Sequence, residues 1–399
     1  MTTAAAPSMP SAAKAAPAHR TYNFSAGPGV LPEEVIRQAQ HDLWDISLEG
    51  KSTGIGIMEH SHRGKTFDAV LAAAEANCRK VASIPANYKV LFLTGGATSQ
   101  NFMVPANLLP DNGVAAFLTT GYWCEKTWDE SKFYSGNCYE AWDGRGVKHD
   151  HCPSDAEIKY PAGSKPAYVH MCSNNTIYGT QWRNQDGTER LPKVPDGVPL
   201  VCDASSDIFS RPIDISKYGM IYAGAQKNIG IAGTTLAIIR EDLLKPARKL
   251  PTMLRYETHA KDGSRHNTPP AFAIYMSGLV FDWILKQGGV GPMHKRNLEK
   301  ATIIYDAIDG SKFWKGHARA DKDNNSRSLM NITFRVSPEV KNAEALDEQF
   351  VKDAFKNGMD QLKGHRSTGG VRASVYNAFP IEGAKALAQF MKEFEKKNG

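Results

Sequence analysis

Residues 220–240 read MIYAGAQKNIGIAGTTLAIIR, two short apolar runs joined by a glycine-rich turn that carries Lys227. Similar apolar runs lie upstream, and helix-like segments separate most of them. The polar turns that end these upstream runs are GGATSQ (95–100), GYW (121–123), SNNT (173–176) and CDASS (202–206). Buried strands that alternate with helices are typical of α/β domains. The sequence therefore predicts an α/β fold class, with a mostly parallel sheet and helices on both faces.

The last third of the chain has a different pattern, in which long helix-like segments flank a few strand-like ones. This pattern predicts a smaller α+β unit that begins near residue 292. We therefore divide the chain into a disordered tail at 1–20, a large domain at 36–291 and a small domain at 292–399, with residues 21–35 packing on the small domain.

Composition excludes several classes of protein. The chain has 399 residues, of which 41% are hydrophobic and 23% charged, near the average for globular proteins. Its net charge of +6 comes from interspersed residues, which indicates neither a nucleic-acid partner nor a membrane surface. The longest apolar stretch, Ala271–Phe281, is shorter than the about 18–20 residues that cross a bilayer, so we expect a buried helix there.

The cysteine content and residues 1–20 give information on the cellular compartment of the protein. The 6 cysteines show no CxxC spacing and are too sparse for a disulfide framework, which favours a reduced, cytoplasmic setting. Residues 1–20 are rich in Ala, Pro and Ser and lack an acidic residue. We expect a disordered tail there, with an organelle-targeting segment as the alternative.

Two charged side chains follow buried runs directly. Asp203 follows PLVC, and Lys227 follows MIYAGAQ. A lysine desolvated in this way has a lowered pKa and can form a Schiff base, whereas a carboxylate there needs a positive partner. With the GGATSQ turn before a helix, this set suits pyridoxal 5′-phosphate (PLP): a lysine, an acid for the ring nitrogen and amides for the phosphate. The alternative, which spacing alone favours, is an ordinary buried Asp203–Lys227 ion pair.

Other polar motifs are less specific. The loops HSHRGK (60–65) and KGHRSTGGVRAS (363–374) carry arginines that suit an anionic substrate, or are solvated surface charge. Trp123 can stack on a flat ring or pack in the core. The segment HDHC (149–152) fits no standard zinc spacing, so we expect an exposed loop there and no metal site.

Taken together, several motifs in the same order resemble the phosphoserine aminotransferase family over about residues 21–399. They are NFSAGPGVLP (23–32), MEHSHRGK (58–65), LFLTGGATSQ (91–100), GYW (121–123), AGAQKNIG (223–230), HNTPP (266–270), SLMNITF (328–334) and LKGHRSTGGVRASVYNAFP (362–380). The resemblance implies a class-V, PLP-dependent aminotransferase of PLP fold type I. It also implies a homodimer with active sites at the subunit interface.

The resemblance also assigns roles to single residues. Lys227 would form the Schiff base, Asp203 would pair with the ring nitrogen, Trp123 would stack on the ring and Thr176 would hydrogen-bond the cofactor. The remaining cofactor residues would be Gln226, Ala97 and Thr98 at the phosphate, with Asn267 and Thr268 reaching the phosphate of the neighbouring subunit. The substrate residues would be Arg372 at the α-carboxylate and His62, Arg63, His365 and Arg366 at the distal phosphate or carboxylate.

The implied reaction interconverts 3-phosphohydroxypyruvate and glutamate with phosphoserine and 2-oxoglutarate in serine biosynthesis. Alternatives are the same chemistry on 4-phosphohydroxythreonine in vitamin B6 synthesis, a related small-substrate aminotransferase, or a nucleotide-type binding protein, whose GxGxxG or GxxxxGK[ST] motif is missing. Two features depart from the family pattern: Thr98 stands where some members carry Arg, and the loop at 44–60 is longer than in many members.

Overall fold

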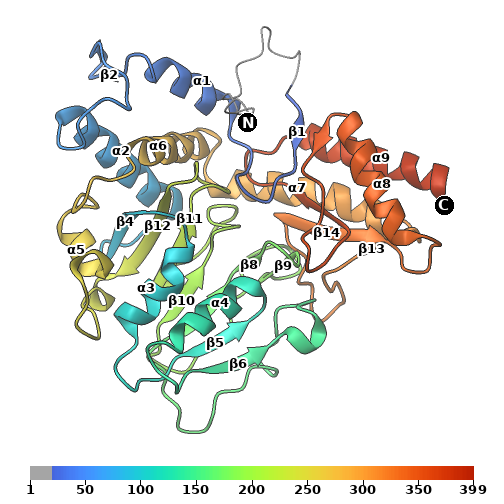
Figure 1. The fold of residues 1–399 in the computed structure, drawn as a ribbon, viewed down its shortest axis with the longest axis horizontal. Helices are drawn as coiled ribbons and strands as arrows, with labels where there is room; N and C mark the ends of the chain where they lie inside the picture. The colour runs from blue at the N-terminus through green and yellow to red at the C-terminus, as the bar shows by residue number, and fades with distance from the viewer. Residues whose placement is uncertain (1–19) are drawn as a thin grey trace, which may run out of the picture.

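A seven-stranded sheet forms the centre of the larger part of the molecule in the computed structural model, which describes residues 20–399 (Figure 1). In spatial order its strands are β4 (Tyr88–Thr94), β12 (Thr234–Arg240), β11 (Met220–Gly224), β10 (Leu200–Asp203), β7 (Val169–Cys172), β5 (Ala116–Thr119) and β6 (Tyr139–Asp143). Only β12 runs antiparallel to its neighbours in this sheet. The predicted α/β class with a mostly parallel sheet is confirmed.

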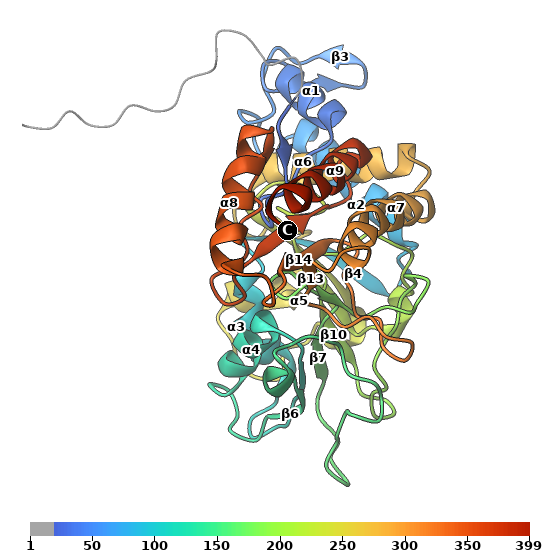
Figure 2. The same ribbon diagram turned by 90° about the vertical axis from the view of Figure 1, so that its right-hand side faces the viewer.

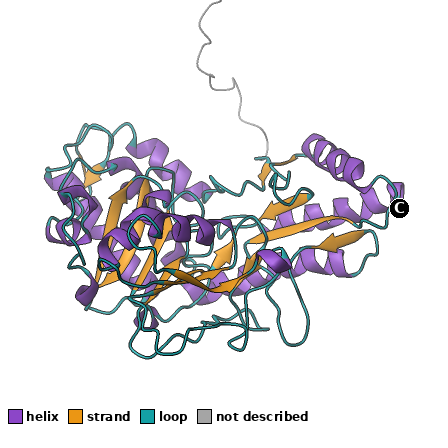
Figure 3. Ribbon diagram, turned by 60° about the horizontal axis from the view of Figure 1, so that its bottom comes forward, coloured by secondary structure: helices purple, strands orange, loops and turns teal. Residues whose placement is uncertain are grey.

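Both faces of this sheet are buried, which explains why its strands are continuous apolar runs rather than alternating ones. In β10, Val201 faces one hydrophobic core and Cys202 faces the other. Helices α2 (Lys65–Ala82) and α6 (Ala271–Lys286) cover the face of Cys202, and α3 (Thr98–Leu108), α4 (Tyr122–Ser131) and α5 (Tyr256–Lys261) cover the face of Val201. Figure 3 shows helices on both sides of the strands.

The C-terminal third forms a second unit beside the large sheet (Figure 2). Its antiparallel sheet has the order β13 (Trp314–Gly316), β14 (Asn331–Val336) and β16 (Val371–Ser374). Its helices are α7 (Val290–Asp309), α8 (Ala343–Lys356) and α9 (Ile381–Asn398). Strand β1 (Tyr22–Asn23) pairs in parallel with β15 (Met359–Asp360), and Phe24 packs in the core of this unit. The division at residue 292 stays a prediction, because α7 begins before it.

Two elements of the N-terminal half were not expected from the sequence. Helix α4 begins within the GYW turn, and its buried residues are the small or polar Cys124, Thr127 and Ser131, so it lacks an apolar stripe. The long loop at 44–60 contains a two-stranded hairpin, β2 (Ser47–Leu48) and β3 (Lys51–Ser52), which follows α1 (Glu33–Asp42). Figure 2 shows α1 and β3 together at one end of the molecule.

Two further expectations concern the longest apolar stretch and the N-terminal tail. The apolar stretch at Ala271–Phe281 lies in the buried helix α6, and over residues 20–399 no helix has the length and apolar character that a bilayer crossing requires. The predicted tail lies outside the described residues, except for Arg20.

The expectation of an exposed loop at HDHC was wrong. His149 and His151 are only 3% and 1% exposed. Carboxylates make this burial possible: His149 Nε2 lies 3.0 Å from Glu125 Oε1, and the two nitrogens of His151 lie 2.5 Å from Asp150 Oδ1 and 3.1 Å from Glu157 Oε1. Within residues 20–399 no group of three or more His, Cys, Asp or Glu side chains is placed to hold a metal ion.

Replacing Glu157 with glutamine is expected to lower stability at neutral pH. Burial raises the pKa of Glu157, but hydrogen bonds from Ser154 and His151 outweigh it and lower the pKa to about 2. A carboxyl group with a lowered pKa in the fold stabilises the protein when the pH is above its pKa in the unfolded chain. This stabilisation is lost as the pH falls toward the folded pKa of about 2. We expect a loss of about 1 kcal/mol at pH 7, less than the full shift implies, because Glu157 is partly exposed.

Urea titrations of both proteins from pH 7 to pH 2.5 test this prediction. The difference in unfolding free energy should shrink steadily below about pH 4.5. Glu339 is exposed, so Glu339→Gln serves as the control and should leave the unfolding free energy unchanged at every pH. A Glu157→Gln deficit that does not change with pH would contradict the proposed role of its charge.

Candidate functional site

The turns that follow the parallel strands meet at one edge of the large sheet, because those strands end on the same side. They enclose a cavity of about 100 Å³, which we call the lysine pocket. Its lining residues are Gly96, Ala97, Thr98, Asn101, Trp123, Asp203, Ser205, Gln226 and Lys227.

Lys227 lies just beyond the end of β11, and its Nζ donates to Thr176 Oγ1 at 2.7 Å. Burial lowers the pKa of Lys227 to about 8; the nearby Asp203 carboxylate opposes this shift and Arg372 adds to it. A substantial share of this amine is therefore neutral near physiological pH, whereas an ordinary lysine is almost fully protonated. A neutral, buried amine is a nucleophile for carbonyl carbons and can accept a proton.

Asp203 ends β10 and faces the same pocket. Its Oδ1 accepts from the backbone N–H of Ser205 at 2.9 Å. Among the described residues Asp203 has no ion-pair partner within 4.0 Å, Lys227 included, so the expectation of an ordinary buried ion pair is not met. The carboxylate is left free to meet a positive group of a ligand.

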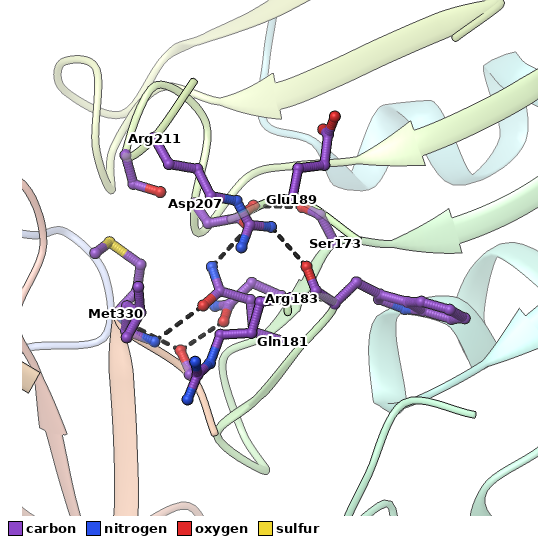
Figure 4. A network of polar contacts seen from close by, with 12 residues as sticks. Ser173, Gln181, Arg183, Glu189, Asp207, Arg211 and Met330 are labelled. Carbon is purple, nitrogen blue, oxygen red and sulfur yellow. Dashed lines mark hydrogen bonds and ion pairs between the residues drawn. The ribbon is translucent and has the colours of Figure 1, made fainter. Parts of the chain in front are cut away.

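A buried polar network fixes the turn that carries Asp203 (Figure 4). The backbone N–H of Ser173 donates to Asp203 O at 3.0 Å, and the Ser173 hydroxyl donates to Asp207. Asp207 Oδ2 also accepts from Gln181 Nε2 at 2.9 Å and pairs with Arg211 at 3.4 Å. Because Asp207 has partners on both of its carboxylate oxygens, the turn that carries Asp203 is held in place.

The opposite wall of the lysine pocket is the N-terminus of α3. Gly96, Ala97 and Thr98 line it where the helix begins. The first N–H groups of a helix lack partners within the helix, and its dipole favours anions there. Gly95 has φ +100°, a conformation that suits glycine and lets the chain turn sharply from β4 into this helix. This wall suits a phosphate group.

Arg372 approaches from the second sheet. It lies on β16, and its Nη1 donates to the backbone oxygen of Thr176 at 3.3 Å. Thr176 therefore contacts both the amine of Lys227 and the guanidinium of Arg372. A planar guanidinium binds a carboxylate through two parallel hydrogen bonds, so a carboxylate held by Arg372 would lie near the amine.

Sequence reasoning missed part of the lysine pocket. Gly96, Asn101 and Ser205 line it but were not predicted. Asn101 lies three positions after Thr98 on the same helix face, and Ser205 lies two positions after Asp203, so local spacing was a usable signal for both.

The other predicted residues lie outside the lysine pocket. His365 and Arg366 line a separate cavity of about 650 Å³ beside α8. His62 and Thr268 line another, of about 570 Å³, which we call the His62 cavity. Arg63 is exposed, and Asn267 donates to Thr94 Oγ1 at 3.0 Å. Within one chain, none of these residues lines the lysine pocket.

Comparison with known proteins agrees with this geometry. Residues 21–387 match the model of the class-V aminotransferases. The fold is also that of pyridoxamine–pyruvate aminotransferase from Mesorhizobium loti, at a TM-score of 0.71 and 18% identity, with 95% of this chain and 93% of that chain covered. The fold and the site thus define a class-V aminotransferase of PLP fold type I.

More similar relatives narrow the family. Phosphoserine aminotransferase of Herpetosiphon aurantiacus is 48% identical over 380 residues, which cover 95% of this chain and 99% of the relative. The structure of phosphoserine aminotransferase from Bacillus circulans subsp. alkalophilus has a TM-score of 0.86 at 43% identity, covering 95% and 99% of the two chains. The PLP-bound enzyme from Trichomonas vaginalis has a TM-score of 0.84 at 35% identity, covering 94% and 100%. The chain belongs to the phosphoserine aminotransferase family.

Proposed function

We propose that this chain is a PLP-dependent phosphoserine aminotransferase of serine biosynthesis, which interconverts 3-phosphohydroxypyruvate and glutamate with phosphoserine and 2-oxoglutarate. The observation that carries the proposal is the amine of Lys227, held 2.7 Å from Thr176 Oγ1 in a pocket that also presents Asp203. Family membership over residues 21–387 supports it.

The lysine pocket fits the cofactor. It offers an amine with a pKa of about 8, a carboxylate without an ion-pair partner among the described residues, a flat indole and a helix N-terminus. We propose that Lys227 holds PLP covalently, that Asp203 keeps the proton on its ring nitrogen and that Trp123 stacks on its ring. Ala97, Thr98 and Gln226 would bind its phosphate, and Thr176 would orient it. When bound, PLP supplies an electron sink for the carbon that carries the amino group.

In this proposal Lys227 moves the proton of the reaction. With substrate bound, the Lys227 amine would be the base that takes the proton from the carbon carrying the amino group and holds it for delivery to the accepting carbon. A pKa of about 8 is near the pH at which such a base must both accept and release a proton. Arg372 would hold the substrate α-carboxylate in reach of that amine.

We further propose that the active enzyme is a homodimer in which His62, Arg63, Asn267 and Thr268 complete the lysine pocket of the partner. In one chain, within residues 20–399, His62 Nε2 is buried without a hydrogen-bond partner. Beside the His62 cavity, Met58 is 63% exposed, and Trp44 of the same segment is 86% exposed. Large apolar side chains exposed together are typical of an interaction surface. His365 and Arg366 would bind the distal phosphate.

Serine at both Trp44 and Met58 is expected to weaken this dimer. Burying each apolar side chain is worth about 1.5–3 kcal/mol, so the pair should raise the dissociation constant by over about 100-fold. Sedimentation velocity over a range of concentrations measures the constant, and activity should fall with the dimer fraction. The control is Phe133→Ser, since Phe133 is 91% exposed on another part of the surface. A fully active monomer would contradict the proposed shared site.

Absorbance and half-reactions test the proposed function. The purified protein should show a band near about 400–430 nm, and borohydride should fix PLP to Lys227. Rapid-mixing spectra should show fast conversion by phosphoserine and glutamate and slow conversion by alanine, which lacks a distal anion. Equal rates with alanine would contradict the substrate class, and a colourless protein that PLP does not label would contradict the whole proposal.

A further inference from the structure

The segment 25–29, which we call the cover loop, lies directly against Lys227. A Cβ atom at Gly27 would lie 3.5 Å from Lys227 Cγ and 3.7 Å from its Cε. The N–H of Gly29 donates to the backbone oxygen of Gln226 at 2.7 Å. The cover loop therefore limits both the space and the water available to the lysine side chain.

Tyr376, at the far end of the chain, holds the cover loop in place. Its side chain is 1% exposed, and its hydroxyl donates to Ala26 O at 2.6 Å. Its ring lies against the loop as well, since a Cβ at Gly29 would be 2.7 Å from Tyr376 Cδ2. The contact combines a hydrogen bond with close packing.

Two neighbours fix the orientation of Tyr376. Asn331 Nδ2 donates to the Tyr376 hydroxyl oxygen at 3.1 Å, which leaves the single hydroxyl proton for Ala26. The buried Lys300 donates to the backbone oxygens of Val375 at 2.9 Å and Tyr376 at 2.6 Å. The backbone and the hydroxyl of Tyr376 are thus both held before any ligand binds.

We propose that Tyr376 is a positioning residue for Lys227, which keeps the cover loop on the lysine side chain and thereby holds its amine at Thr176. This inference rests on the proposed function, because the position of the Lys227 amine affects catalysis only if Lys227 acts as proposed. Without the hydroxyl, the cover loop loses its hydrogen bond, and the lysine side chain gains conformations and water. A displacement of about 1 Å at a reacting group can cost about 100-fold in rate.

Water at Lys227 also has an electrostatic consequence. Burial is the largest cause of the lowered pKa of Lys227, so hydration should raise that pKa toward the ordinary value. The other groups that act on it are Asp203, Arg372, Cys172 and Asp207, and none of the variants used below replaces one of these residues.

Tyr376→Phe tests the proposal in the full-length holoenzyme, with Tyr305→Phe as a matched control. Tyr305 is also buried, and its hydroxyl donates to a backbone oxygen, that of Ser328, at 2.9 Å. Amide hydrogen exchange is measured on the peptide that contains Gly27 and Gly29, and kcat and KM are measured separately. The pH midpoint of the cofactor absorbance band is the third measurement.

For Tyr376→Phe we expect amide exchange in the cover-loop peptide to be about tenfold faster than in the control. We also expect kcat to fall about tenfold with little change in KM. The pH midpoint of the cofactor absorbance band should move to higher pH. Both variants should lose similar thermal stability, because each loses one buried hydrogen bond. Equal exchange in the two variants, or a kcat within twofold of wild type, would overturn the proposal. Exchange is measured without turnover, so failure of the proposed function, seen as a colourless wild-type protein, is a separate result.

Asn331→Asp provides a second variant should Tyr376→Phe not fold. A carboxylate only accepts, so it would draw the Tyr376 proton away from Ala26. Exchange in the cover-loop peptide should again rise. Unchanged exchange there would also contradict the proposal.

Discussion

Lys227→Ala is expected to abolish transamination while leaving the fold intact. Proton transfer by a positioned side chain alone contributes about 10²–10⁴-fold to a rate, and this variant also loses the covalent attachment of the cofactor. The fold should survive because the ammonium form of Lys227 lies in an unfavourable place: burial lowers its pKa to about 8. The melting temperature of the cofactor-free protein should therefore be unchanged or slightly higher.

Single-turnover spectra with phosphoserine, circular dichroism and sedimentation check these expectations. Lys227→Arg is the matched control, since it keeps the charge and length but offers no nucleophilic amine at neutral pH. Both variants should be folded and inactive. Transamination at the wild-type rate in either one would contradict the assigned role of Lys227.

Arg372→Ala is expected to have the second-largest effect, a loss of about 10²–10⁴-fold in kcat/KM. Hydrogen bonds to charged groups are worth about 1.5–3 kcal/mol each, and a guanidinium makes two to one carboxylate. The loss should be equal for phosphoserine and glutamate, because both carry the α-carboxylate. Arg372→Lys should recover only part of it, since an ammonium lacks the planar pair of donors.

Steady-state kinetics with both amino acids measure this effect. The control is Arg327→Ala, which removes another arginine of the C-terminal unit, paired with Asp309 at 2.6 Å and outside the lysine pocket. A loss for phosphoserine only would contradict this role and would indicate that Arg372 binds the distal phosphate instead of the α-carboxylate.

The large sheet and the core of the lysine pocket were predictable because each depends on a local rule. A polar residue directly after a buried strand marks an edge of the sheet, and this rule alone led to Asp203 and Lys227. Helix α4 was not predicted, because its buried face is formed by Cys124, Thr127 and Ser131 rather than by large apolar residues.

Other features depend on contacts that no local pattern records. The burial of HDHC follows from Glu125, 24 positions before His149, and from Glu157, 6 positions after His151, and neither spacing belongs to a regular helix or strand pattern. Tyr376 and Ala26 are 350 positions apart, so neither residue indicates the other. The places of His62 and Arg63 depend on a second chain in our proposal, which lies beyond any reading of one sequence.

The pairing of β1 with β15 has a consequence for the order in which the protein can be made. Residues 22–29 leave the ribosome long before Met359, which pairs with Tyr22, and Tyr376, whose hydroxyl donates to Ala26. Contacts between such distant positions form late and slow folding. A nascent chain can therefore complete its large sheet while Lys227 is still uncovered, and the finished site exists only once these two distant segments have met.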